Sequence, residues 1–188
     1  MSETKAAIFP SLSAAQKNVV RSYHIRTAAF WNVIVSQLDD FSKLYIEETE
    51  GSVSDEALEQ MMDMLFEILI NKNTELMPGY VIPVELTNEL SLACQLPEQL
   101  LRNRIMDIMQ SFKAAKQNYR QGRGAYPLPG MKSNRSNHTV RFERGDFEIK
   151  GDIITFNGRF KLSIQDVKIA RYDNSKVKSV SLSRKKVG

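Results

Sequence analysis

The sequence contains one cysteine, two histidines and no long apolar run among its 188 residues. Because Cys94 stands alone, an internal disulfide framework is excluded, and with only His24 and His138 beside it we expect no Cys/His zinc site. No apolar run approaches the ~20 residues that span a bilayer, and the first residues lack the basic and apolar regions of a secretion signal. We therefore expect a cytoplasmic protein without a membrane partner.

The sequence also lacks the motifs of common catalytic sites. No phosphate loop of the GxxxxGK(S/T) kind and no GxGxxG occurs. Cys94 has no base beside it, so we expect it in the core, and His24 lies beside an apolar helical stripe, as a structural histidine would. The carboxylates of residues 39–67 fall on helix ends and a loop, which favours a solvated face over a two-metal site. We therefore expect no enzyme activity, no bound metal and no cofactor.

Charge is distributed unevenly along the chain. Residues 1–112 carry eight basic and sixteen acidic side chains, a net charge of −8, whereas residues 113–188 carry eighteen basic and six acidic ones, a net charge of +12. An asymmetry of this size between the two parts indicates a polyanionic partner for the second, and nucleic acid is the most common one. A solvated basic surface is the other interpretation.

Glycine usage changes at almost the same place. Two glycines occur before residue 122 and seven from there on, so the first part is predicted to be helical and the second to be short strands with tight turns. A capping box at Ser13 and Gln16 begins a helix to about residue 46, and further helices are expected over about 54–70, 83–95 and 97–119. Five methionines at helical core spacing are expected in the core, with a promiscuous protein-binding face as the other interpretation: Met61, Met62, Met64, Met106 and Met109.

Period-two patterning begins at residue 139 and predicts four to six short antiparallel strands. Turns are indicated by Gly145, Gly151 and the pair Asn157-Gly158. Strands this short and strongly curled suggest a small OB-like barrel. The expected fold class is therefore α+β.

The basic segment from residue 113 to 144 gives the most specific functional signal. Its cations can neutralise phosphates, the aromatic rings among them offer stacking faces, and nearby amide and hydroxyl groups can contact bases or sugars. The spacing of Lys113, Lys116 and Arg120 predicts that they project from one side of a helix. For His138, a nucleic-acid contact and a plain loop are equally open. The candidate nucleic-acid-binding residues are Lys113, Lys116, Gln117, Arg120, Arg123, Lys132, Arg135, Asn137, His138, Thr139 and Arg141.

The order of several short motifs resembles the TnpB (OrfB) proteins of insertion sequences, the RNA-guided nucleases related to type V CRISPR effectors. Residues 8–16 (IFPSLSAAQ) resemble their opening strand, proline and helix start, and Trp31-Asn32 resembles the aromatic-Asn pair of their first helix. The SFK that ends residues 101–113 is similar to the end of their L-x-x-A-F-K helix. Residues 124–132 (GAYPLPGMK) resemble their G-x-P-x-F-K loop. Residues 136–142 (SNHTVRF) and 176–184 (KVKSVSLSR) resemble two of their strands.

This resemblance implies an architecture. Residues 1–10 would supply the first strand of a wedge barrel, residues 11–121 an inserted helical recognition lobe, and residues 122–188 the rest of the barrel. In the family these lobes grip the guide RNA and the target DNA, and positions matching Lys113, Gln117 and 137–139 face a short motif beside the target. Met131 in place of an aromatic residue, and the acidic segment 39–67, depart from the family pattern.

The resemblance covers only the N-terminal half of such a protein. The RNase-H-like nuclease domain, its three acidic metal ligands and its zinc-binding insert lie beyond the part that matches, so DNA cleavage is not expected from these residues. The leading hypothesis is a non-catalytic nucleic-acid-binding module, encoded by a bacterium or phage. A subunit of a split nuclease, active only with a separate nuclease chain, and an adaptor that binds a protein through its acidic helices are the other two.

Overall fold

The computed structural model divides the chain into two compact units. The helical unit is Arg26–Ser136, and the β unit combines Met1–Ile25 with Asn137–Gly188. These bounds differ from the divisions after residues 10 and 121 that the resemblance implies. The expected first strand, residues 1–10, lies outside the described residues. The structure describes residues 13–49, 54–125, 127–132, 139–151, 153–156, 160–163 and 177–182.

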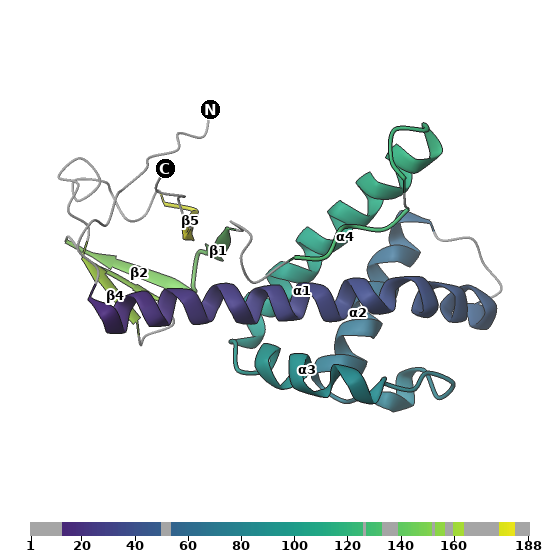
Figure 1. The fold of residues 1–188 in the computed structure, drawn as a ribbon, viewed down its shortest axis with the longest axis horizontal. Helices are drawn as coiled ribbons and strands as arrows, with labels where there is room; N and C mark the ends of the chain where they lie inside the picture. Colours follow the sequence, from purple (N-terminus) through teal and green to yellow (C-terminus); the bar gives the residue numbers. More distant parts are fainter. Residues whose placement is uncertain are drawn as a thin grey trace. The chain divides into compact units, whose positions relative to one another are not determined.

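Helix α1 (Ala14–Thr49) begins at the predicted capping box. Ser13 Oγ accepts a hydrogen bond from the backbone N–H of Gln16 (3.2 Å), and Gln16 Oε1 accepts one from the N–H of Ser13 (3.0 Å). The helix contains 36 residues, which makes it about 54 Å long. It is the long purple-to-blue helix of Figure 1, and its residues from Arg26 onward belong to the helical unit.

Three further helices lie in the described part of the helical unit: α2 (Asp55–Ile70), α3 (Thr87–Ala93) and α4 (Glu98–Arg120). Short 3-10 turns at Thr74–Leu76 and Val84–Leu86 connect α2 to α3. All four predicted helices are therefore confirmed, although the third is shorter than its pattern suggested. No helix in the described part of the chain is long and apolar enough to cross a membrane.

The helical unit is built around aromatic side chains. Phe30, Phe41, Phe66 and Phe112 are each no more than 1% exposed, and the rings of Phe30 and Phe66 meet edge to face with centroids 6.2 Å apart. Burial of a large aromatic side chain removes the most apolar surface from water per residue, so these four rings dominate the stability of the unit.

Two predicted core residues lie at the surface. Met106 is 44% exposed and Cys94 is exposed. Met106 occupies an outward position of α4, because its neighbours Ile105 and Ile108 take the inward ones. Cys94 caps the end of α3, where Ala93 is the buried residue. Among the other predicted core methionines, Met61, Met62 and Met109 are buried and Met64 is partly buried. His24 is buried, as predicted.

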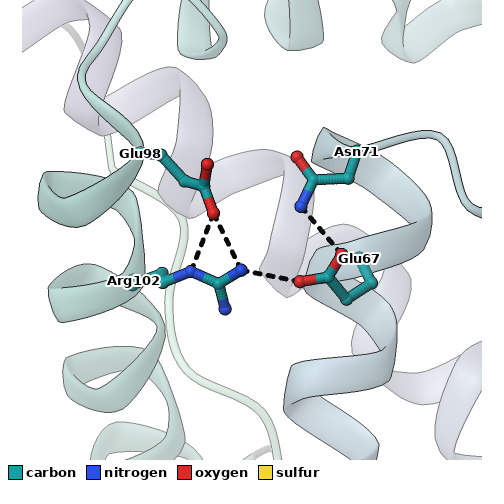
Figure 2. A network of polar contacts seen from close by, with 4 residues as sticks. All are labelled: Glu67, Asn71, Glu98 and Arg102. Carbon is teal, nitrogen blue, oxygen red and sulfur yellow. Dashed lines mark hydrogen bonds and ion pairs between the residues drawn. The ribbon is translucent and has the colours of Figure 1, made fainter.

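A polar network joins α2 to α4 (Figure 2). One guanidinium nitrogen of Arg102 lies 2.7 Å from Glu67 Oε1 and 2.8 Å from Glu98 Oε1, and Asn71 donates a hydrogen bond to the second oxygen of Glu67 (2.8 Å). These hydrogen bonds hold the pKa of Glu67 below its usual value, with Asn71 the larger cause and Arg102 the second. The network therefore fixes the relation of two helices through one half-exposed arginine.

The described residues of the β unit contain five short antiparallel strands. β1 (Val140–Glu143) pairs with β5 (Ser179–Leu182), and β2 (Phe147–Lys150), β3 (Ile153–Phe156) and β4 (Phe160–Ser163) form a second sheet in that order. The predicted strands are confirmed, and the fold class is α+β. In the described residues the strands form two separate sheets rather than a closed barrel.

Tight turns and an aromatic core explain how these strands pack. Gly145 and Gly151 have φ values of +107° and +60°, which a residue with a side chain rarely adopts, and each lies in a predicted turn. The predicted Asn157-Gly158 turn lies outside the described residues. Phe142 is fully buried between Tyr23 of α1 and Phe156, with ring centroids 5.5 and 4.7 Å away. The first turns of α1 thus belong to the β unit through side-chain contacts.

Candidate nucleic-acid interface

The basic segment, residues 113–144, leaves α4 through a turn with a fixed backbone conformation. Gly122 has a φ of +68°, its N–H donates to Tyr119 O (3.0 Å), and the N–H of Arg123 donates to Asn118 O (2.8 Å). These two bonds and the left-handed glycine make a Schellman motif, which satisfies the last carbonyls of a helix. The motif fixes the point at which the chain turns away from α4, so the position of Arg123 is set by the backbone.

The second half of α4 carries the first group of predicted contact residues. Lys113 and Lys116 are half-buried, whereas Gln117 and Arg120 are exposed. The ammonium of Lys116 lies 4.5 Å from the centroid of the Phe112 ring, a cation–π contact. Burial, and then the positive charge of Arg120, lower the pKa of Lys116. The exposed end of the helix, rather than its middle, therefore offers the most accessible donors.

Lys132 is held against α1, away from this group. The side-chain amide of Asn32 donates to Lys132 O (2.7 Å) and accepts from Lys132 N (2.7 Å), so it pairs with both backbone groups of one residue. The indole of Trp31 donates to Gly130 O (3.0 Å). The ammonium of Lys132 lies 3.6 Å from the centroid of the Trp31 ring. Together, Trp31 and Asn32 form a clamp that holds residues 130–132.

An open depression of about 420 Å³ lies beside this clamp. Trp31 and Lys132 form one wall, and the other is a face of α4 that carries Arg104, Asp107, Gln110, Ser111 and Ala114. With 3.6 residues per turn, this face differs from the one that carries Lys113, Lys116 and Arg120. The predicted cations of the helical unit are therefore divided between two faces of α4.

Arg104 is the least expected member of the depression. Its side chain is only 10% exposed, and its Nη1 lies 2.8 Å from Asp107 Oδ2. Burial, and then the positive charge of Arg104, lower the pKa of Lys132. The depression therefore brings together two cations and one carboxylate, a net charge of +1 in partly desolvated surroundings.

The remaining predicted contact residues lie in the loop after α4, in the β unit or outside the described part. Thr139 and Arg141 are exposed at the start of β1, and Arg141 Nε lies 2.6 Å from Glu143 Oε1. An exposed pair of this kind contributes little to stability, so Arg141 can exchange Glu143 for another anion at low cost. Arg123 is exposed in the loop after α4. Arg135, Asn137 and His138 lie outside the described residues.

Sequence reasoning missed the role of the clamp and of Arg104. Trp31 and Asn32 entered only as a resemblance to a family motif, although the single tryptophan of the chain lies next to an amide side chain. Arg104 interrupts an apolar stripe on α4, between Leu101 and Ile105. An arginine at a core-facing position, with a carboxylate three residues later, was the signal that could have identified the depression.

The described residues contain no cluster of histidine, cysteine and carboxylate side chains that could hold a metal ion. No protein-family model matches the chain, and neither a curated protein nor a solved structure matches it.

Proposed function

We propose that this chain is a non-catalytic nucleic-acid-binding module that grips a guide RNA and its target DNA, in the manner of the TnpB-like proteins it resembles. The proposal includes the finer architecture, in which the β unit belongs to an OB-like wedge barrel and the helical unit is a recognition lobe. The protein would act in the cytoplasm of a bacterium, encoded by the host or by a phage.

One observation carries the proposal. Residues 113–136 contain six basic side chains and no acidic one, whereas residues 26–112 of the same unit contain five basic and fifteen acidic ones. The basic residues 113–136 attract a polyanion, and the acidic residues 26–112 repel it. Together they direct the polyanion to one part of the unit. The Schellman turn and the Trp31–Asn32 clamp support the proposal, since they hold the basic loop at both ends.

The β unit adds a second set of cations. Residues 1–25 and 137–188 carry fifteen basic and seven acidic side chains. Exposed Thr139 and Arg141 lie at the start of β1, and Thr139 is one of the positions that match the motif-facing strand start of the resembled family. We therefore expect both units to contribute to affinity.

Binding of the full chain to a labelled structured RNA, measured by fluorescence anisotropy at several salt concentrations, tests the proposal. We expect affinity to fall steeply as salt rises, because each neutralised phosphate releases a counterion. Arg120→Glu should weaken binding by about tenfold. Lys43→Glu is the matched control, since it makes the same charge change on an exposed helical site within the acidic region. If the affinity for RNA changes neither with salt concentration nor in Arg120→Glu, the proposal is contradicted.

The carboxylates of α2 favour a second function, that of an adaptor which binds a protein partner. Glu56, Glu59 and Asp63 recur at helical spacing on α2 and are not buried. A carboxylate stripe of this kind suits a basic protein surface, as an adaptor would require. Glu59→Lys with Asp63→Lys should then abolish capture of a protein partner while RNA affinity is unchanged. Loss of RNA binding with partner capture retained would reject the adaptor.

A further inference from the structure

We infer that the depression between Trp31 and α4 is a phosphate subsite, which takes one backbone phosphate of the bound nucleic acid through Lys132 and Arg104. The inference rests on the proposed function, gives the predicted contact residue Lys132 a specific ligand, and assigns a role to Arg104, which neither charge counting nor motif matching had singled out. Arg104 contributes from α4 and Lys132 from the clamped loop, so the subsite exists only when the loop is held against α1.

The side chains of the depression favour a phosphate over a base. Trp31 is only 7% exposed and the Lys132 ammonium lies 3.6 Å from the centroid of its ring, so little ring surface remains for stacking. The charged groups sum to +1, with Asp107 occupied by its ion pair to Arg104 at 2.8 Å. Ser111 and Gln110 add neutral donors, which nucleic-acid-binding proteins commonly direct at phosphate oxygens.

The depression is also built before any ligand arrives. Asn32 fixes the backbone of Lys132 through two hydrogen bonds of 2.7 Å, and Asp107 fixes the guanidinium of Arg104. Donors that are already oriented lose less entropy on binding. A phosphate between Lys132 and Arg104 would also offset the repulsion and desolvation that the two cations now experience. The depression is open to solvent, so it can admit a phosphodiester within a chain as well as a terminal phosphate.

The single tryptophan makes the subsite directly observable. Trp31 is the only tryptophan in the sequence, and it lines the depression. We expect its fluorescence emission to change when an oligonucleotide binds, because the Lys132 ammonium shifts from the ring toward the phosphate. In Lys132→Gln the emission change should disappear. Glutamine retains the backbone N–H and C=O that Asn32 holds, and thermal unfolding of the variant checks that the fold is intact.

A scan of neutral linkages identifies the phosphate itself. Methylphosphonate is placed at one position at a time in the oligonucleotide, and affinity is measured for the wild type and for Lys132→Gln. At one position the neutral linkage should weaken wild-type binding by about tenfold and have little effect on the variant. The control Arg123→Gln changes an exposed cation outside the depression, so it should weaken binding overall and retain the wild-type response at that position.

The possible outcomes separate the inference from the proposed function. If RNA binds normally but Trp31 emission is constant and no position couples to Lys132, the subsite is overturned and the proposed function stands. If no nucleic acid binds, the proposed function is wrong. A titration with inorganic phosphate, followed by Trp31 emission, then tests whether the depression binds phosphate at all. An emission change at millimolar phosphate that Lys132→Gln removes would support a site for free phosphate; constant emission would overturn the phosphate chemistry altogether.

Discussion

The helical unit and the β unit each enclose buried phenylalanines, yet they carry opposite net charge. Arg26–Ser136 holds eleven basic and fifteen acidic side chains, whereas Met1–Ile25 with Asn137–Gly188 holds fifteen basic and seven acidic ones. The basic residues from 113 onward do not all belong to the β unit, because residues 113–136 end the helical unit. A charge boundary in the sequence is therefore not a structural boundary, and cations lie in both units.

The units also differ in how they bury polar groups. In the helical unit the Tyr80 hydroxyl donates a 2.7 Å hydrogen bond to Gln37 Oε1 in the interior. In the β unit Asp146 is 6% exposed, and its Oδ2 accepts from the backbone N–H of Glu143 at 3.3 Å. The Tyr80–Gln37 pair loses its proton only at high pH, whereas the Asp146 carboxyl takes up a proton on acidification. The stability of the two units therefore changes in different pH ranges, which allows each unit to be followed separately.

Removal of an aromatic core residue should produce the largest effect. Phe66 is fully buried, meets the Phe30 ring at 6.2 Å and lies under the Arg102 guanidinium at 4.7 Å. We expect Phe66→Ala to lower the free energy of unfolding by about 3–5 kcal/mol, because the cavity is added to the lost transfer free energy. Denaturant unfolding followed by Trp31 fluorescence reports on this unit.

The matched substitution in the β unit is Phe142→Ala, which empties a site between Tyr23 and Phe156. A similar loss of about 3–5 kcal/mol is expected there, measured by amide exchange of β1 to β3. A loss below about 1 kcal/mol in either unit would show that its phenylalanines do not form a cooperative core.

The Tyr80–Gln37 pair should limit the stability of the helical unit at high pH. Burial, and then the negative charge of Asp40, raise the pKa of Tyr80 to about 12. Because the folded pKa lies above the unfolded value, this contribution is complete below about pH 10 and is lost as pH rises through about 12. We expect a loss of about 2 kcal/mol over that interval. Tyr80→Phe should flatten the alkaline decline, and absorbance near 295 nm follows the ionisation; an unchanged decline would assign it to another group.

The Asn32 clamp should have a smaller effect on stability. Asn32→Ala removes two hydrogen bonds to Lys132 and leaves a partly buried N–H and C=O without that partner. We expect a loss of about 1–2 kcal/mol in urea unfolding and a change in Trp31 emission as the loop detaches. Asn88→Ala, at an exposed site of α3, is the control. Equal stability of the two variants would show that the clamp does not hold the loop.

Local signals predicted most of the fold. The capping box at Ser13, the four helices and the turns at Gly145 and Gly151 depend on neighbouring residues, and the structure confirms each of them. Met106 was placed in the core from its helical spacing, and Cys94 because no base lies beside it, but Met106 takes an outward position of α4 and Cys94 caps the end of α3 at the surface.

The candidate site depends on pairs that are distant in sequence, and this is why it was predicted only in part. Asn32 and Lys132 are 100 residues apart, and neither residue type indicates the other. The spacing of Lys113, Lys116 and Arg120 predicted a shared helical face, but could not show that Lys132 lies beside Trp31 at another face. Arg104 likewise shares its depression with Trp31 of α1 and Lys132 of the loop, neither of which lies near it in the sequence.

Acidification should change the two units in opposite directions, with the smallest expected effect. In the helical unit the pKa of Glu67 is lowered by the hydrogen bond from Asn71 and then by Arg102, so its contribution is present above the unfolded pKa and is lost as pH falls through the folded value. In the β unit burial raises the pKa of Asp146, against a smaller opposing effect of its bond to Glu143. That contribution is lost as pH rises through the folded value, so it returns on acidification.

Amide exchange between about pH 6 and 3 should therefore show faster opening of α2 and α4 and slower opening of β1 and β2. For the half-exposed Glu67 network we expect less than about 1 kcal/mol. Asn71→Ala and Arg102→Gln should each reduce the helical response, because the hydrogen bond from Asn71 and then that from Arg102 both lower the pKa of Glu67. Asp146→Asn should remove the response of the strands alone. Parallel responses of both units would mean that α1, which is shared between them, transmits unfolding from one unit to the other.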